Sequence, residues 1–225
     1  MDIEEKLRTV RERIAEACGR AGRDPGDVGL VVVTKTVGAD VIRELISLGV
    51  EDLGENRVQD SAAKAHELGE RPGVRFHMIG HLQRNKAKQV VKLFDMIHSV
   101  DSPRLAEAVS RAAAAEGKEM PVLLEVNVSG EESKFGFDPA GAREAAPQIA
   151  ALPSIRLDGL MTMAPFGAEE GVLRTVFRSL RELAAEISSQ HKIPLPHLSM
   201  GMSQGYEIAV EEGATLVRVG TAIVG

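Results

Sequence analysis

Apolar residues recur along the chain in two patterns that alternate from one end to the other. Short runs rich in β-branched residues, such as Leu30–Val33, are typical of strands buried on both faces of a parallel sheet. Longer stretches carry apolar side chains three or four positions apart, as Leu7, Val10 and Ile14 do near the N-terminus. That spacing predicts an amphipathic helix, and we expect the first such helix to end at Gly19.

Further strand-like runs follow the first one, and helical patterns separate nearly all of them. They are Val50–Leu53, Val74–Ile79, Met96–Val100, Val122–Val128, Ile155–Met161, His197–Met200 and Leu216–Val219. Strands that alternate with helices form βαβ units and a parallel sheet. Eight such units in roughly 200 residues are the minimum for a closed barrel. The sequence therefore predicts an α/β fold, a single (β/α)8 TIM-type barrel with an extra N-terminal helix, as one domain over residues 1–225.

A doubly wound open sheet is the alternative arrangement of the same units. Such a sheet is expected to carry a Gly-x-Gly-x-x-Gly sequence after its first strand, where the backbone approaches a dinucleotide. The residues that follow Leu30–Val33 are Thr34-Lys35-Thr36, which do not fit that pattern. We therefore favour the barrel.

The composition fits a protein that folds around one sizeable core. Hydrophobic residues make up 44% of the 225 residues and charged residues 27%, which is ordinary for a globular domain of this size. Lys and Arg number 27 against 33 Asp and Glu, giving a net charge of −6. This balance argues against nucleic acid as a partner. Aromatic residues are only 3%, with no Trp, so platforms for stacking bases are not expected either.

The cysteine count and the N-terminus indicate the compartment. Cys18 is the single cysteine, which excludes an internal disulfide, fits a reducing environment and suggests a small buried apolar side chain. The first residues are charged and lack the apolar run of a signal peptide. No apolar stretch approaches the ~20 residues that cross a bilayer. We therefore expect a cytoplasmic protein with no membrane partner.

Candidate chemistry is sought at the carboxyl ends of the strands, where barrels of this kind place their active sites. Lys35 follows the first strand between two threonines. Projecting into the mouth of the barrel, its amine would be desolvated, would have a lowered pKa and would attack carbonyl carbon. The alternative is a lysine whose stem packs on the rim while its ammonium group reaches water.

Two glycine-containing loops strengthen the first interpretation. Barrels most often hold phosphate in the loops after the seventh and eighth strands, with backbone N–H groups and a helix N-terminus. Here these loops are Ser199–Ser203 and Val219–Thr221. Either loop alone could be a tight turn, but both beside Lys35 indicate a phosphorylated aldehyde as ligand. A metal site is not expected, because His77 and His81 bracket a strand end without a nearby third ligand.

Several motifs, in order along nearly the whole chain, resemble those of the pyridoxal phosphate homeostasis proteins. The matching segments are Val33–Lys35, Leu53–Asn56, His77–Lys86, Gly159–Met163 and Leu198–Ser203. That family, also called the proline synthetase co-transcribed homologues, is built like the barrel domain of alanine racemase. The resemblance implies a soluble, mostly monomeric carrier or regulator of the cofactor pool. The implied partners are pyridoxal 5′-phosphate (PLP) and the apo-enzymes that receive it.

The resemblance also implies a role for each matching residue. Lys35 matches the lysine that forms the internal aldimine with PLP. The other implied cofactor-binding residues are Asn56 beside the ring and its 3′-oxygen, Arg218 at the pyridine nitrogen, Ser199, Ser203, Gly220 and Thr221 around the phosphate, and His81 and Met200 lining the same pocket.

Three functions remain open: a PLP homeostasis protein, a PLP-dependent amino-acid racemase, and a cofactor-free aldolase that forms a Schiff base with a sugar phosphate. Racemisation needs a base on each face of the α-carbon, and alanine racemases take the second base from a tyrosine of a further domain. The only tyrosine here is Tyr206, expected on a helix, and the barrel uses all 225 residues. We therefore expect a carrier without efficient turnover.

Overall fold

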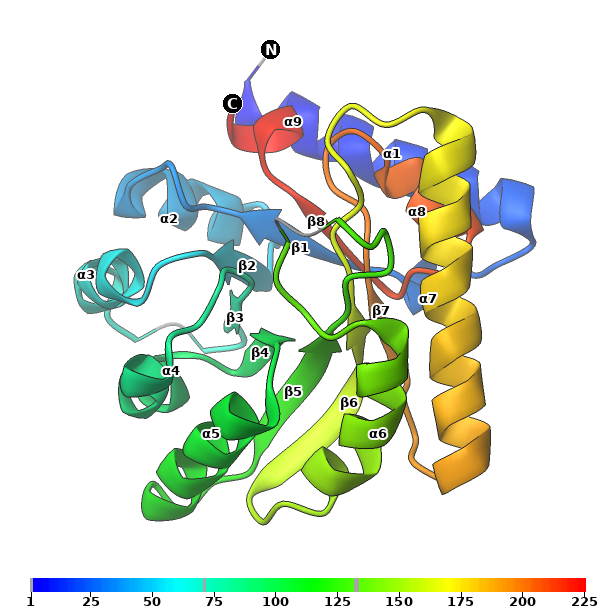
Figure 1. Cartoon of the computed structure of the whole chain (residues 1–225). Helices are drawn as coiled ribbons and strands as arrows, with labels where there is room; N and C mark the ends of the chain where they lie inside the picture. The colour runs from blue at the N-terminus through cyan, green and yellow to red at the C-terminus, as the bar shows by residue number, and fades with distance from the viewer. Residues whose placement is uncertain (1, 71, 132–133) are drawn as a thin grey trace.

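The computed structural model describes residues 2–70, 72–131 and 134–225. Within these residues eight parallel strands pair in sequence order and close into a barrel, with β8 hydrogen-bonded to β1 (Figure 1). The strands are β1 (Gly29–Val33), β2 (Asp52–Glu55), β3 (Arg75–Met78), β4 (Met96–Val100), β5 (Met120–Glu125), β6 (Ile155–Met161), β7 (His197–Ser199) and β8 (Leu216–Val219). The predicted (β/α)8 barrel is confirmed.

Helices alternate with the strands and surround the barrel (Figure 1). They are α1 (Ile3–Ala21), α2 (Ala39–Ser47), α3 (Val58–Leu68), α4 (Ala87–Leu93), α5 (Pro103–Ala115), α6 (Pro139–Ala150), α7 (Glu170–His191), α8 (Tyr206–Glu211) and α9 (Thr221–Val224), with short 3-10 turns at Pro25–Asp27 and Arg84–Lys86. Asp2, Ser102 and Asp138 cap α1, α5 and α6, because each side chain accepts a hydrogen bond from the N–H three residues on.

The extra N-terminal helix is longer than the sequence predicts. It continues past Gly19 to Ala21 and is capped by Gly22, whose φ of 65° is the left-handed conformation that glycine adopts without strain. α1 packs against α8 and α9, so the two ends of the chain lie side by side (Figure 1). The ammonium group of Lys6 donates to the carbonyl of Gly225 at 2.6 Å. This bond ties α1 to the end of the chain directly after α9.

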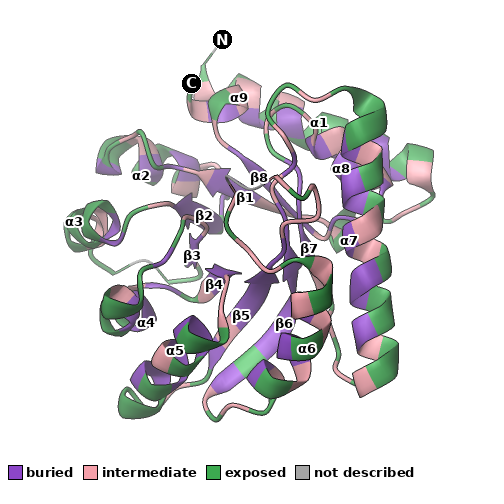
Figure 2. Ribbon diagram, viewed as in Figure 1, coloured by how far each residue is buried: buried purple, intermediate pink, exposed green. Residues whose placement is uncertain are grey.

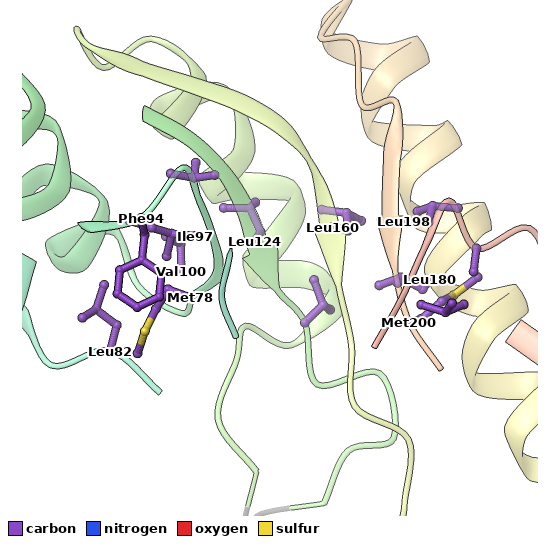
Figure 3. Close-up of a cluster of buried hydrophobic side chains, with 14 of the residues drawn as sticks. Met78, Leu82, Phe94, Ile97, Val100, Leu124, Leu160, Leu180, Leu198 and Met200 are labelled. Atoms are coloured by element: carbon purple, nitrogen blue, oxygen red, sulfur yellow. The ribbon is translucent and has the colours of Figure 1, made fainter. Parts of the chain in front are cut away.

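Most of the apolar core lies between the barrel and its helices. The strands are buried almost throughout, whereas the helices are buried on one face and exposed on the other (Figure 2). A part of this layer includes Phe94 and Ile97 on one side and Leu180 and Met200 on the other (Figure 3). Cys18 is fully buried here and unpaired, as predicted for a small apolar side chain.

The inside of the barrel contains a second, much smaller apolar cluster. Its buried members are Val31, Leu123, Met161 and Leu216. The barrel interior also contains polar side chains, because His98 on β4 is hydrogen-bonded to Ser199 on β7, across the barrel. A core filled by side chains is usual for eight strands, but a partly polar one requires every buried donor and acceptor to find a partner.

Candidate functional site

A cavity of about 340 Å³ opens at the carboxyl ends of the strands. This volume lies in the range of small-molecule sites. Of the residues expected to bind a cofactor, the lining includes Lys35, Asn56, Ser203, Arg218, Gly220 and Thr221. None of the described lining residues is acidic. The cavity therefore suits a ligand that carries negative charge.

Lys35 lines the cavity directly after β1, and the residue before it is anchored on the outer side of the barrel. The hydroxyl of Thr34 donates to Glu55 Oε1 at 2.6 Å, and Lys64 Nζ donates to the Thr34 carbonyl at 2.8 Å. Because side chains alternate along an extended strand, this outward Thr34 directs Lys35 inward. Lys35 itself is exposed, so burial, which the sequence argument invoked for its reactivity, is not a feature of the site.

Hydrogen-bond donors gather on the side of the cavity formed by the loops after β7 and β8. Ser203 Oγ accepts from the N–H groups of Gly220 and Ala222 at 3.3 and 3.4 Å. Gly201, with a φ of 89°, lets the first loop lie against α8, since a Cβ there would stand 2.5 Å from the Cβ of Ala209. Ser203, Gly220 and Thr221 thus line the same side of the cavity, and the two hydroxyl groups are suitable for an anion.

Arg218 on β8 supplies a buried cation to the same cavity. Its guanidinium group donates to the Thr162 carbonyl at 2.9 Å and to Ser199 Oγ. Burial lowers the pKa of Arg218 to about 10, against the opposing effect of Glu125. At neutral pH the group is therefore still a cation, and it can only donate hydrogen bonds.

A chain of hydrogen bonds leads from Arg218 through the barrel interior. Beyond Ser199, the next links are Ser199 Oγ to His98 Nδ1 at 2.8 Å, His98 Nε2 to His77 Nδ1 at 2.9 Å, and His77 Nε2 to Asp52 Oδ1 at 2.8 Å. Asp52 is in turn paired with Arg75 at 2.6 and 2.8 Å. This chain was not predicted from the sequence. Its only signal was a histidine in the middle of each of two apolar runs, Val74–Ile79 and Met96–Val100.

Comparison with known sequences identifies the family. The family described as the N-terminal domain of alanine racemase matches residues 6–225. The pyridoxal phosphate homeostasis protein of Aquifex aeolicus is 42% identical over 225 residues, covering 100% of this chain and 98% of that protein. Its namesake in Pseudomonas aeruginosa is 41% identical over 223 residues, covering 99% and 95%. The chain belongs to the pyridoxal phosphate homeostasis protein family. The resemblance seen in the sequence is confirmed.

Solved structures agree with this assignment. A structure of the family member PipY from Synechococcus elongatus, determined with PLP bound, is 38% identical with a TM-score of 0.89, and each chain is covered completely. Alanine racemase from Clostridium difficile superposes with a TM-score of 0.76 at 14% identity, over 98% of this chain and 56% of the racemase. That second likeness shows the fold alone, which is the barrel domain of the racemases.

Three residues expected at the cofactor lie elsewhere in this family member. Ser199 is fully buried, and its hydroxyl is bonded to His98 and Arg218, so it belongs to the interior chain and does not line the cavity. Met200 is the next residue and faces outward into the core near Leu180 (Figure 3). His81 is exposed at the rim, where its ring stacks on Phe135 with centroids 3.9 Å apart.

Glu125 is a further buried titratable group at the carboxyl end of β5. Burial and the nearby Asp101 raise its pKa to about 7, whereas Arg218 opposes the shift. Its Oε2 atom has no hydrogen-bond partner in the part of the chain that the structure describes.

Residues 2–70, 72–131 and 134–225 contain neither a metal-binding cluster nor a membrane-spanning helix. No three His, Cys, Asp or Glu side chains there come together as a metal site would require. No helix there has both the length and the apolar character needed to cross a bilayer.

Proposed function

We propose that this protein binds PLP in the cavity at the carboxyl ends of the strands, holds it as a Schiff base on Lys35, and serves the homeostasis of that cofactor. The observation that carries the proposal is the lining itself. An exposed lysine amine, a buried guanidinium group and a cluster of hydroxyl and N–H donors surround one cavity without a carboxylate among its described residues. The names of the relatives and the PLP-bound structure of PipY support it.

The donor set fits PLP group by group. When bound, PLP supplies an aldehyde that condenses with a primary amine, with loss of water, and an electron-withdrawing ring. Lys35 is the amine of the lining. Ser203 and Thr221, together with the backbone at Gly220, would hold the phosphate, and Asn56 would lie beside the 3′-oxygen. Ser199 is left out of the proposed phosphate site, because its hydroxyl is engaged inside the barrel.

Arg218 determines the electronic state of the ring in this proposal. Because a guanidinium group only donates, the ring nitrogen facing it must accept and therefore stays unprotonated. An unprotonated ring stabilises a carbanion poorly, which restrains side reactions of the bound cofactor. This electronic state does not by itself exclude racemisation, which depends on a base at each face of the α-carbon.

The remaining parts of the proposal concern the cellular setting. We place the protein in the cytoplasm, acting as a monomer, with PLP-requiring apo-enzymes as recipients of the cofactor. The unpaired Cys18 is consistent with a reducing compartment. A cofactor-free aldolase acting through Lys35 is the competing function, and the absorption spectrum separates the two, because only bound PLP gives a visible band.

The attachment is tested with Lys35→Ala. We expect the purified variant to show no visible Schiff-base band after PLP is added, and borohydride reduction to trap no cofactor on the protein. Lys88→Ala is the matched control, since Lys88 is an exposed lysine on α4 away from the cavity. A band in Lys35→Ala that borohydride still traps would place the attachment at another lysine, which peptide mass spectrometry would locate.

The phosphate site is tested with Ser203→Ala and Thr221→Val. Each substitution removes a charge-assisted hydrogen bond of about 1.5–3 kcal/mol, so PLP should bind about tenfold to a hundredfold more weakly. Unphosphorylated pyridoxal should bind as it does to the unmodified protein. Thr36→Val, next to Lys35 but outside the lining, serves as the control. Equal weakening of both ligands would show that these hydroxyls do not recognise the phosphate.

A further inference from the structure

The chain of hydrogen bonds behind Arg218 connects the two ends of the barrel. Ser199 and His98 are fully buried, and His77 and Asp52 are nearly so. Asp52 also lines a second cavity, of about 310 Å³, at the amino ends of β1 and β2. The links join β8, β7, β4, β3 and β2. Few arrangements of protons satisfy all of these buried atoms at once.

The direction of each hydrogen bond follows from its two ends. Arg218 can only donate, so Ser199 Oγ accepts from it and has its own proton available for His98 Nδ1. His98 then carries its proton on Nε2 and donates to His77 Nδ1. His77 in turn carries its proton on Nε2 and donates to Asp52. With both imidazole rings neutral, every proton points from Arg218 towards Asp52, and each ring carries its proton on Nε2.

Electrostatics determine the charge of two members of the chain, His98 and Asp52. Burial, together with the neighbouring His77 and Arg218, holds the pKa of His98 well below its ordinary value. Burial alone would raise the pKa of Asp52, but hydrogen bonds from Arg75 and His77 hold it well below its usual range. The chain therefore begins at a cation, Arg218, and ends at an anion, Asp52.

We infer that Asp52, His77, His98 and Ser199 are positioning residues that orient the guanidinium group of Arg218 towards the ring nitrogen of the bound cofactor. This inference rests on the proposed function. Within the described residues no carboxylate forms an ion pair with Arg218, so neutral oxygens alone hold its guanidinium group. One of them, the Ser199 hydroxyl, can rotate and either donate or accept. Its orientation towards Arg218 is fixed by its hydrogen bond to His98, whose ring is held by His77 and Asp52.

If these four residues had only a structural role, their substitution would have a different effect. The chain would then only satisfy its own buried atoms, and its loss would lower stability without changing how Arg218 meets the ring. Ser110 provides the matched comparison, because it is also buried and its hydroxyl donates to the Pro153 carbonyl at 2.5 Å, away from the cavity. A substitution there removes the same kind of bond without touching Arg218.

The first measurement needs no cofactor. Long-range ¹H–¹⁵N spectra of the histidine rings in the unmodified protein at neutral pH should show His77 and His98 as neutral Nε2–H tautomers. A proton on Nδ1 of either ring, or a doubly protonated ring, would overturn the directed chain. This outcome is independent of whether PLP binds.

The second measurement uses Ser199→Ala, Ser199→Thr and Ser110→Ala, each loaded with PLP labelled with ¹⁵N in the ring. Ser199→Ala should still attach the cofactor to Lys35, as judged by borohydride trapping, but should shift the ring-nitrogen signal and weaken PLP binding about tenfold, equivalent to about 1.4 kcal/mol. Ser199→Thr keeps the hydroxyl and should restore both properties. Ser110→Ala should change neither.

The outcomes separate the inference from the function on which it rests. If Ser199→Ala matches Ser110→Ala in the ring-nitrogen signal and in affinity, the positioning role is wrong while the proposed function stands. If the unmodified protein traps no PLP, the proposed function fails, and the role of the chain towards the cofactor fails with it. Should Ser199→Ala not fold, His98→Gln breaks the same chain one link further from Arg218, with the same expected shift.

Discussion

Glu125 places a proton-binding group deep in the barrel mouth. Its pKa of about 7 in the folded protein, against an ordinary 4.5, means that the protonated form is favoured by folding. Below pH 4.5 the carboxyl is protonated in both the folded and the unfolded chain, and it has no effect on the pH dependence. Between 4.5 and 7 only the unfolded chain ionises, so stability falls as the pH rises, and above 7 the loss is complete.

Glu125→Gln should remove this loss. A shift of this size corresponds to about 3 kcal/mol, so between pH 4.5 and 8 the unmodified protein should lose about that much more unfolding free energy than the variant. Asp101 and Arg218 are the charged groups facing Glu125 and are the same in both proteins. Urea unfolding across this range gives the difference, with the exposed Glu119→Gln as control. Parallel pH profiles for Glu125→Gln and the unmodified protein would contradict the raised pKa.

The sequence indicated most of the site residues but not the direction in which each one points. Its motif Ser199–Ser203 contains two serines, and only the structure shows that β7 ends at Ser199. Ser199 therefore faces the barrel interior, Met200 the helices and Ser203 the cavity. A shift of one residue in the register of the strand reverses the directions of Ser199 and Met200, and no pattern in a single sequence determines that register.

At the scale of elements, α3 is joined to the ends of β1 and β2 by a buried ion pair. Lys64 Nζ lies 2.7 Å from Glu55 Oε1, and Glu55 is fully buried with no partner for its second oxygen in the described residues. The same ammonium group donates to the Thr34 carbonyl, directly before Lys35. Removing one partner of such a pair leaves an uncompensated buried charge, which is more damaging than removing both.

Lys64→Met should therefore destabilise the protein by about 3–5 kcal/mol, as measured by urea unfolding. The double variant Lys64→Met with Glu55→Gln should recover part of this loss, because no charge is then left buried. Lys92→Met is the control, since its pair with Glu116 lies on the surface at 3.2 Å and should contribute at most about 1 kcal/mol. A double variant as unstable as Lys64→Met alone would argue against the buried charge as the cause.

The same polar groups explain where strand prediction from the sequence was inaccurate. The apolar run predicted a strand over Val50–Leu53, whereas β2 occupies Asp52–Glu55. Asp52 is buried because it pairs with His77 and Arg75, and Glu55 is buried because it pairs with Lys64. From the sequence alone an acidic residue is expected to be exposed to solvent, since its partners are not known. Runs without acidic residues, such as Met96–Val100 and Leu216–Val219, were predicted with the correct bounds.

At the scale of the whole molecule, closure of the barrel assembles the site from opposite ends of the chain. β1 pairs with β8 and with β2, so Lys35 after β1 lies between Asn56 after β2 and Gly220 after β8. The alternation of strands and helices was sufficient to predict this closure. The sequence could not reveal the interior chain, because its members come together only when β4 and β7 face each other across the barrel.

Among the described residues that line the cavity, Lys35 is the one side chain that can act as a base at neutral pH. Racemisation requires a proton acceptor on each face of the α-carbon, and Lys35 supplies one. Tyr206, the sole tyrosine of the sequence, is buried at the start of α8 and does not line the cavity. Burial and the neighbouring Glu207 raise the pKa of its phenol, so it does not act as a base at neutral pH. Arg218 is likewise protonated there.

We therefore expect PLP-loaded protein to racemise amino acids at well below about 1 s⁻¹, the low end of ordinary enzymes. The measurement is incubation with L-alanine and other L-amino acids in deuterium oxide, following α-proton exchange by NMR and chirality by chromatography. Slow exchange with retained chirality is the behaviour of one base on one face, and it should disappear in Lys35→Ala. Tyr206→Phe should leave that exchange unchanged, because the phenol is not in the cavity. Turnover near 1 s⁻¹ that depends on Lys35 would instead require a second base. The protein would then be a racemase, and the expectation of a carrier without efficient turnover would be wrong.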